Sequence, residues 1–274
     1  MPLPRILSGL GEIASDYDSL VCDVWGVLHN GRVANRAAVE ALRKFRETGK
    51  VVLLSNAPRP KRDLLVQFER YGIPDDAYDE IVTSGIATRL DLERRRPATM
   101  YHLGPARDRG IFEGLGIQET DIGRAEVVLN SGLFDDDVET PDDYRDRLAA
   151  MKAHGLPMLC ANPDWVVQRG GKLIWCAGAL ADAYEKIGGR VIYYGKPKPE
   201  IYELVRQTAA GKLLAIGDGL HTDIKGANAA GIDALFIADG IHGEDVREMT
   251  PAHLAELFAG AGVTARAAMR SLSW

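Results

Sequence analysis

Cysteine is scarce in this chain of 274 residues, which contains only Cys22, Cys160 and Cys176. An odd number of cysteines does not suit a disulfide framework, and their spacing lacks the close pairs of a structural zinc site. We therefore expect free thiols in a reducing compartment, the cytoplasm.

Long apolar runs are missing as well. The segment MPLPRILSGLGEIASDY at the amino end lacks the apolar core of a signal peptide, and no run of about 18 apolar residues could span a bilayer. We expect a soluble cytoplasmic protein that has no membrane partner.

Positive charge is not in excess. The chain has 33 Lys and Arg against 39 Asp and Glu, a formal net charge of −6, and the basic run from Glu93 to Arg96 is short enough to be a solvated helix end. Because nucleic acid binding depends on clustered Lys and Arg, we do not expect nucleic acid to be the main partner.

What the chain does contain is an alternation of predicted strands and helices. Apolar residues recur at helical spacing between Arg36 and Glu47, and a continuous apolar run follows from Val51 to Leu54. Pro58 and Pro60 open a second helix, which Gly72 ends, and residues 80–83 form another short strand. Such alternation predicts an α/β fold with a parallel sheet covered by helices.

The middle and last thirds of the chain repeat this alternation. The predicted strands are residues 99–103, 126–130, 156–161, 191–194, 213–216 and 234–237. The predicted helices are residues 141–154 and 177–187, two that begin near Pro199 and Asp223, and two terminal ones near Asp245 and over residues 251–259. A hairpin is predicted for residues 166–168 and 173–175, around Arg169, Gly170 and Gly171.

No low-complexity linker separates these series. A domain inserted into another domain leaves no such linker, so we predict domain boundaries near Ser84 and Tyr193. The length suits one large or two modest domains.

Polar residues suited to phosphate chemistry follow four of the predicted strands. They are Asp23, Ser55 with Asn56, Lys196, and Asp218 with Asp223 five residues further on. In an open α/β sheet, ligands bind in the crevice outside the carboxyl ends of the strands. Their order and spacing together therefore indicate one phosphate site.

Each of these residues taken singly also has a structural interpretation. Ser55 and Asn56 suit an N-cap ahead of the helix that Pro60 opens, which is compatible with phosphate binding because both use backbone amides. Asp223 likewise suits an N-cap, and Lys196 suits a solvated turn. The residues His29, His221 and His242 are interpreted as loop histidines rather than metal ligands.

Together the motifs resemble those of the haloacid dehalogenase superfamily of phosphohydrolases, over nearly the whole chain. The four segments are DVWGVLHNG, LLSNAPRP, YGKPKP and AIGDGLHTDIKGANAAGI. The segment between the second and third motifs, with ANPDWVVQRGG and CAGALADAYEKIGG, is similar to the type A second-position cap of class IIA, NagD-type sugar phosphatases and their pyridoxal and glycerol phosphate relatives. The resemblance implies a Rossmann-like core of residues 1–83 and 194–274 with an inserted α/β cap of residues 84–193.

The resemblance implies a role for each catalytic residue. Asp23 is the nucleophile that forms an aspartyl phosphate. The Ser55 hydroxyl and the Asn56 backbone amide hold one phosphate oxygen, and Lys196 holds another while it screens Asp23.

A magnesium ion is implied as the cofactor. Its expected ligands are Asp23, the backbone carbonyl of Trp25, and Asp218. Asp223 is a further ligand, directly or through water, or else a partner that orients the ligands.

Trp25 departs from the family pattern. The position two residues after the nucleophile usually holds a second aspartate, which protonates the leaving group and then activates water, and an indole cannot shuttle a proton. Positioned acid/base catalysis is worth roughly 10² to 10⁴ in rate, about 3 to 5 kcal/mol. The simplest interpretation of Trp25 is structural: its ring packs under the cap.

Three outcomes follow for the function. The protein is a slow or specialised magnesium-dependent phosphatase acting on a small phosphorylated metabolite such as a sugar phosphate, or it binds a phosphorylated ligand as a regulatory protein without turnover. The third outcome is a different reaction at an aspartyl intermediate. We prefer the phosphatase because the other motif positions are intact, and a homodimer is a possible assembly.

The cap is expected to supply specificity. Asn162 and Asp164, in an Asn-Pro-Asp turn, are predicted to approach the substrate, although the same residues also suit a turn or a cap of a helix or strand. Trp165 and Arg169 would contact a ring-bearing or anionic leaving group, or else are simply exposed.

Overall fold

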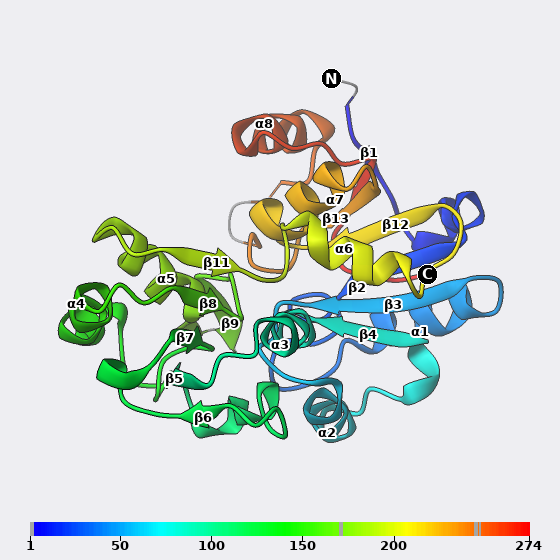
Figure 1. Cartoon of the computed structure of the whole chain (residues 1–274). Coiled ribbons are helices and arrows are strands. Elements are labelled where there is room, and N and C mark those ends of the chain that lie inside the picture. Colours follow the sequence, from blue (N-terminus) through cyan, green and yellow to red (C-terminus); the bar gives the residue numbers. More distant parts are fainter. Residues whose placement is uncertain (1–2, 170–171, 244–245, 247) are drawn as a thin grey trace.

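The structure is a computed structural model that describes residues 3–169, 172–243, 246 and 248–274. Its larger sheet contains seven parallel strands in the order β1-β14-β13-β12-β2-β3-β4 (Figure 1). The bounds of these strands are β1 Arg5–Ile6, β2 Ser19–Asp23, β3 Lys50–Ser55, β4 Glu80–Thr83, β12 Leu213–Gly217, β13 Asp233–Ile237 and β14 Ala267–Met269. The interior strand β2 lies between β3 and β12, so their carboxyl ends meet at one edge.

Strand β2 is buried on both faces because helices cover the sheet on both sides. Leu20 and Cys22 belong to one hydrophobic cluster and Val21 to the other, as the two-residue period of a strand requires. The first cluster includes residues of the helices α1 Arg36–Arg46 and α2 Lys61–Tyr71. The second includes residues of α6 Pro199–Arg206, α7 Lys225–Ala229 and α8 Pro251–Ala261.

Local signals set the ends of several of these helices. The Asn35 side chain accepts a hydrogen bond from the Ala38 amide and caps α1. Gly72 ends α2 in the left-handed conformation, with φ of 76°. Pro199 occupies the first position of α6. The predictions for these three helices are therefore confirmed.

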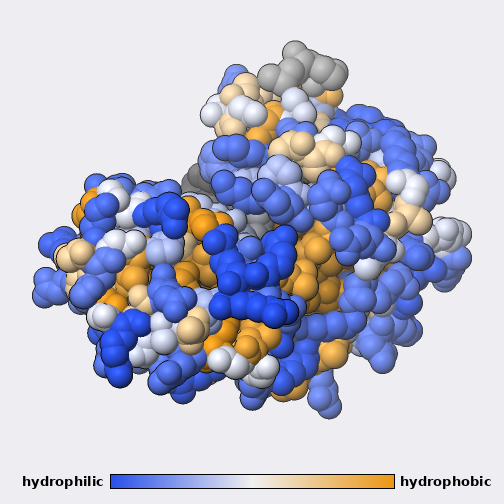
Figure 2. All heavy atoms as spheres, in the orientation of Figure 1, coloured by the Kyte–Doolittle hydropathy of each residue, from blue (hydrophilic) through white to orange (hydrophobic). Residues whose placement is uncertain are grey.

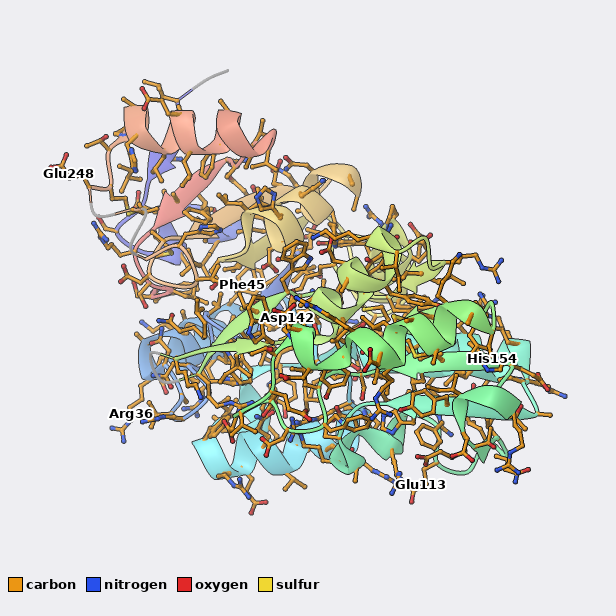
Figure 3. All side chains as sticks on the ribbon, turned by 90° about the vertical axis from the view of Figure 1, so that its left-hand side faces the viewer. Arg36, Phe45, Glu113, Asp142, His154 and Glu248 are labelled. Carbon is orange, nitrogen blue, oxygen red and sulfur yellow. The ribbon has the colours of Figure 1, made fainter. Side chains whose placement is uncertain are left out.

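The cap contains a second parallel sheet of five strands, in the order β11-β8-β7-β5-β6, which lies to the lower left in Figure 1. Its strands are β5 Thr99–Leu103, β6 Gln118–Glu119, β7 Val127–Asn130, β8 Met158–Cys160 and β11 Val191–Tyr193. The longer helices in this part of the chain are α3 Ser84–Arg95, α4 Arg145–Ala153 and α5 Ala177–Lys186. Seen from the cap side, Asp142 and His154 flank α4 in front, while Arg36 and Phe45 mark α1 of the core (Figure 3).

The predicted hairpin is confirmed. Strands β9 Val166–Arg169 and β10 Lys172–Trp175 pair antiparallel, and Arg169 lies in a strand rather than in the turn. Gly170 and Gly171, predicted for the turn, lie outside the described residues.

Two predicted helices have different starts in the structure. Residues 141–144 form a 3₁₀ turn before α4, because Thr140 and Asp143 make a capping box there. The helix predicted from Asp223 begins three residues earlier, with a π-helical turn at Leu220–Ile224. The helix predicted near Asp245 falls partly outside the described residues.

The sequence does not predict the remaining short elements, because runs of two to six residues show little periodicity. They include β1, β6 and β14 and the 3₁₀ helices η1 Leu10–Glu12, η2 Ala14–Asp16, η3 Asp75–Ala77, η4 Ala106–Ile111 and η5 Ile122–Arg124. The two turns at the starts of predicted helices are labelled η6 Pro141–Tyr144 and η7 Leu220–Ile224.

The two large sheets draw their strands from separate parts of the chain, residues 5–83 with 213–269 and residues 99–193. The boundaries at residues 84 and 193 stay a prediction, and "core" and "cap" are used here in that sense. Figure 2 shows a strongly hydrophilic patch near the middle of the view, between the cap and the core. No helix within the described ranges is long and apolar enough to cross a membrane.

Candidate active site

A cavity of about 1170 Å³ lies between the core and the cap. The predicted site residues Asp23, Ser55, Asn56, Lys196, Asp218, Asp223, Asn162 and Asp164, together with Trp25, all line it. The four motifs are therefore brought together in space. Three of them lie at strand ends of the larger sheet, as predicted, but Lys196 follows β11 of the smaller sheet, which the prediction of one shared sheet edge did not foresee.

Lys196 lies at the centre of this arrangement. Its ammonium donates to Asp23 Oδ1 at 2.5 Å, to Asp223 Oδ1 at 2.7 Å and to the Leu54 carbonyl at 3.2 Å. Burial alone lowers the pKa of Lys196, but the charges of Asp223 and Asp23 outweigh it and raise the pKa well above its usual value. The solvated-turn interpretation is wrong, since the Lys196 side chain is only 3% exposed.

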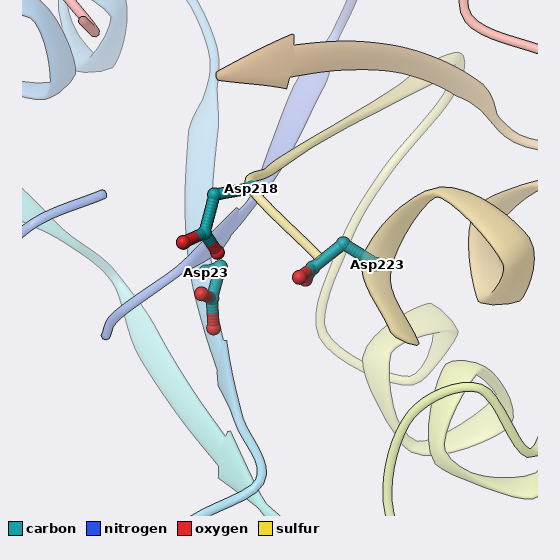
Figure 4. Close-up of side chains that lie close together, drawn as sticks. All are labelled: Asp23, Asp218 and Asp223. Atoms are coloured by element: carbon teal, nitrogen blue, oxygen red, sulfur yellow. The ribbon is translucent and has the colours of Figure 1, made fainter. Parts of the chain in front are cut away.

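Three carboxylates converge beside this ammonium. Asp23, Asp218 and Asp223 point toward one another (Figure 4), and one oxygen of each lies within 4.8 Å of the others. Burial, and then the charge of Asp223, raises the pKa of Asp23 and raises that of Asp218 to about 7. Such a buried excess of negative charge favours a bound cation.

Two glycines leave room for the Asp218 carboxylate. A Cβ at Gly26 would lie 2.2 Å from Asp218 Oδ2, and one at Gly240 would lie 1.9 Å from the same atom. The adjacent Ile241 amide donates to this oxygen at 2.7 Å and fixes its direction. The chain therefore encloses Asp218 with backbone alone.

Asp223 lies inside the π-helical turn. Its Oδ2 accepts a hydrogen bond from the Gly219 amide at 3.1 Å, while Oδ1 accepts from Lys196. Gly219, not Asp223, occupies the N-cap position, so the N-cap interpretation of Asp223 is wrong.

Ser55 is the last residue of β3, Asn56 follows it, and both are buried. Ser55 Oγ accepts a hydrogen bond from the Ala57 amide at 3.1 Å. The Asn56 side chain accepts from the Lys196 amide at 2.8 Å and donates to Asp164 Oδ1 at 2.8 Å. Neither residue caps α2, whose N-cap is Pro60, so that alternative is wrong.

Trp25 joins the core to the cap. Its indole Nε1 donates to the Gln168 carbonyl of β9 at 2.8 Å. The half-buried ring lies against Gly31, where an added Cβ would approach Trp25 Cζ2 to 2.7 Å. The ring therefore packs under the cap, as its plainest interpretation predicted. No backbone hydrogen bond among the described residues goes to the Trp25 carbonyl.

Asn162 and Asp164 form the predicted turn. Asn162 Oδ1 accepts a hydrogen bond from the Asp164 amide at 3.0 Å. Asp164 also reaches the core through Asn56, a contact that the sequence did not predict. A second unpredicted contact between cap and core joins Arg59 Nε to Asp108 Oδ1 at 3.1 Å.

The other two predicted cap residues differ in their surroundings. Arg169 is half-buried and pairs with Asp136 at 3.0 Å and Asp137 at 3.3 Å, so simple exposure does not describe it. Trp165 is 53% exposed, with the Lys186 ammonium 5.6 Å from the ring centre.

The histidines do not join the carboxylate cluster. Within the described residues, the two groups with metal-ligand geometry contain only aspartates; the second is Asp135 to Asp137 in the cap. His29 is buried behind Trp25, and burial lowers its pKa to about 4. His221 and His242 line the cavity wall.

Comparison with known proteins agrees with this geometry. A family model described as haloacid dehalogenase-like hydrolase matches residues 20–118, and another, described as HAD-hydrolase-like, matches residues 193–261. The crystal structure of a haloacid dehalogenase-like hydrolase from Brucella suis 1330 is 38% identical, covers 98% of this chain and 100% of its own, and has a TM-score of 0.86.

Two further relatives are more distant. The ribonucleotide monophosphatase NagD of Escherichia coli K12 is 29% identical over 244 residues, which cover 85% of this chain and 92% of that protein. The glycerol phosphate phosphatase of Mycobacterium tuberculosis in complex with magnesium shares the fold, with 24% identity, a TM-score of 0.66 and coverage of 84% of this chain and 70% of its own.

The chain belongs to the haloacid dehalogenase-like hydrolases. Within them it is a class IIA phosphatase of the NagD type, with a parallel-sheet α/β core and an added cap, which confirms the family and fold predicted from the four motifs.

Proposed function

We propose that the protein is a magnesium-dependent phosphoric monoester hydrolase that forms an aspartyl phosphate on Asp23. Its substrate is a small phosphorylated metabolite such as a sugar phosphate, and its turnover is slow or specialised because Trp25 replaces the usual acid. The observation that carries the proposal is the Lys196 ammonium, which bridges Asp23 and Asp223 beside Asp218 in a buried cavity.

The side chains have complementary roles in this reaction. Asp23 attacks phosphorus in line with the leaving oxygen, so negative charge spreads over the equatorial phosphate oxygens. Lys196 holds one of these oxygens and screens the approach of the anionic Asp23. The Ser55 hydroxyl and the Asn56 amide hold another.

The carboxylate cluster fits a hard divalent cation. Asp23, Asp218, the Trp25 carbonyl and Asp223 would hold Mg²⁺, because it prefers oxygen ligands and the glycines around Asp218 leave no competing side chain. The ion would neutralise charge on the transferring phosphoryl group. The magnesium complex of the Mycobacterium tuberculosis relative supports this choice of metal.

The cap, proposed as residues 84–193, encloses the leaving group and excludes water. The Escherichia coli relative is a ribonucleotide monophosphatase, which supports a phosphoester of a small metabolite as the substrate. Asn162 and Asp164 line the cavity where such a leaving group would lie.

One observation favours a second function, binding of a phosphorylated ligand without turnover. The indole N–H of Trp25 is already bonded to Gln168 of the cap, so this position joins the cap to the core and gives no proton. A regulatory protein would need only the phosphate site.

The two functions are separated by one panel of sugar phosphates, nucleotides, pyridoxal phosphate and 4-nitrophenyl phosphate, scored with Mg²⁺ for phosphate release and for a shift in melting temperature. We expect release, and we expect Asp23→Asn to abolish it. Stabilisation by a ligand without release would instead support the binding function. Full activity of Asp23→Asn would rule out Asp23 as the nucleophile.

A further inference from the structure

The site described above needs an acid, and Trp25 is not free to act even as a hydrogen-bond donor. The indole has a single N–H, which is given to the Gln168 carbonyl at 2.8 Å. If the proposed phosphatase function holds, another group must protonate the leaving oxygen of any substrate that is not already a good leaving group.

Most other acidic groups on the cavity wall are already engaged. Asp108 is paired with Arg59 at 3.1 Å, and Asp136 is held by Arg107 and Arg169. Asp239 pairs with Arg270 at 3.3 Å. Burial raises the pKa of Asp136, but Arg169 and Arg107 outweigh it and lower that pKa overall, which does not suit a proton donor. Burial keeps the pKa of Asp108 raised in spite of Arg59, but its Oδ1 is occupied by that guanidinium.

Asp164 differs from these carboxyls in its partners. Its Oδ1 accepts one hydrogen bond from the neutral Asn56 amide at 2.8 Å, and no hydrogen bond to Oδ2 is found within the described ranges. The residue is partly exposed and lines the cavity, so Oδ2 is available to a ligand there. Burial raises the pKa of this carboxyl, although Lys196 opposes that effect.

The position of Asp164 also suits a leaving group. The residue follows β8 of the cap, whereas Asp23 ends β2 of the core. In-line displacement sends the leaving oxygen away from the nucleophile, which here means toward the cap. The Asn162 side chain accepts a hydrogen bond from the Asp164 amide and so orients the Asp164 backbone. The Asn56 side chain donates to the Asp164 carboxyl and holds it beside the end of β3.

We propose that Asp164 is the general acid and base of this site, in place of the aspartate that position 25 lacks. Asp23 attacks phosphorus, the bond from phosphorus to the leaving oxygen breaks, and that oxygen takes the proton from Asp164 and departs as an alcohol. The Asp164 carboxylate then takes a proton from water as the water oxygen attacks phosphorus. The bond from phosphorus to Asp23 breaks, which releases phosphate and restores both side chains.

The test is Asp164→Asn, which keeps an oxygen to accept from Asn56 but cannot transfer a proton. kcat/KM is measured with Mg²⁺ for 4-nitrophenyl, 4-chlorophenyl and phenyl phosphate, whose leaving groups become progressively more basic. We expect a loss that grows along this series and reaches about 10² for phenyl phosphate. We also expect a burst of 4-nitrophenol, because the aspartyl phosphate forms but hydrolyses slowly.

A merely positioning role makes a different prediction. An equal loss on all three esters, without a burst, would show that Asp164 only orients Asn56, and this result overturns the proposal. The proposal is also overturned if His221→Asn, at another position that lines the cavity, gives the graded loss instead. If the unaltered protein releases no phosphate from any ester, the phosphatase function itself is refuted and the role of Asp164 with it.

Two further variants keep the result interpretable. Asp182→Asn makes the same chemical change on α5 of the cap, where Asp182 pairs with Lys186 at 2.6 Å, and should leave all three rates unchanged. Trp25→Asp combined with Asp164→Asn restores a carboxyl at the position where the family has one, and should recover phenyl phosphate turnover at least tenfold. If the double variant folds but its turnover of phenyl phosphate does not recover, then the defect of Asp164→Asn is not the loss of a general acid.

Discussion

The carboxyl ends of two parallel sheets line the same cavity, but they bring different groups to it. The core sheet presents Asp23, Ser55 and Asp218, and each of these side chains accepts a hydrogen bond from the core or from Lys196. The cap sheet presents amides and a carboxyl, among them Asn162 and Asp164, from a turn that follows β8. In the proposed function, the core holds the groups that act on phosphate, and the cap holds those that meet the rest of the substrate.

Burial explains why the two sets of groups are held so differently. The buried ammonium of Lys196 in the core is held between two carboxylates, those of Asp23 and Asp223. Charges in the cap are more exposed and pair with arginines, as Asp136 does with Arg107 and Arg169. Changes in the core should therefore cost much more than changes at the contact between core and cap.

The largest effect is expected from Lys196→Met. It leaves two buried carboxylates without their cation, so we expect phosphate release to be lost and the free energy of unfolding in the absence of metal to fall by about 3 to 5 kcal/mol. Urea denaturation and phosphate assays measure these two effects. Lys198→Met, two residues further on at an exposed position, is the matched control and should change stability little. A stable, active Lys196→Met protein would show that the core cluster does not depend on this cation.

The second-largest effect is expected from protonation of two buried histidines, one in the core and one in the cap, which should lower the free energy of unfolding. Burial lowers the pKa of His29 in the core and of His102 in the cap to about 4. Each folded-state pKa lies below the unfolded value near 6.5, so each histidine stabilises the fold above pH 6.5 and loses that contribution as the pH falls toward 4. The loss amounts to roughly 3 kcal/mol for each residue at full protonation.

Denaturation at pH 7.5 and pH 4.5 measures this contribution. His29→Gln and His102→Gln should each reduce the change in unfolding free energy between the two pH values, while the exposed His154→Gln should not. Equal pH dependence in all three variants would contradict the assigned role of burial.

A smaller effect is expected from Gly240→Ala in the core. The new methyl group would meet Asp218 Oδ2 and displace the carboxylate, so the affinity for Mg²⁺ should fall by roughly 10 to 100-fold. Calorimetric titration with Mg²⁺ measures this change. Gly260→Ala in α8, where a Cβ meets no atom within 4 Å, is the control. Unaltered metal affinity would remove Asp218 from the ligand set.

The smallest effect should come from the contact between the two regions. Trp25→Phe keeps an aromatic ring but removes the hydrogen bond to Gln168, which is worth about 1 kcal/mol. We expect faster hydrogen exchange in β9 and β10, with exchange in β2 unchanged. Slower or equal exchange in the hairpin would show that the indole does not hold the cap closed.

The residues of the core site could be predicted from the sequence because they belong to recognisable motifs. The contacts between cap and core could not be predicted, because they depend on the three-dimensional arrangement of the two parts. Asp23, Ser55 and Asp218 lie at the ends of the paired strands β2, β3 and β12, so parallel pairing alone brings them together. Lys196 instead follows β11 of the cap sheet, and only its sequence motif made it predictable. The bond between Asn56 and Asp164 joins residues 108 apart in the chain, at the ends of strands in different sheets. Their meeting depends on how the cap is oriented, which no local pattern encodes.

The same reasoning explains the smaller errors. The helical pattern in the sequence starts near Asp223, which makes an N-cap role for Asp223 one alternative. In the structure the π turn begins at Leu220, and Gly219 is its N-cap. The short strands β1 and β14 pair only with each other and with β13, and contain too few residues to show alternation. Long-range pairing rather than local sequence determines them.

Lys196 has one more consequence. It comes three residues after Tyr193, the last residue of the cap strand β11, so the chain that leaves the cap carries the cation of the core. If the cap of a relative replaced this one with a junction at residue 193, the new chain would have to connect β11 to Lys196 in the same way for the Lys196 ammonium to reach Asp23. With the proposed boundary at residue 193, one end of the inserted cap is thus joined by a short segment to a residue of the proposed site.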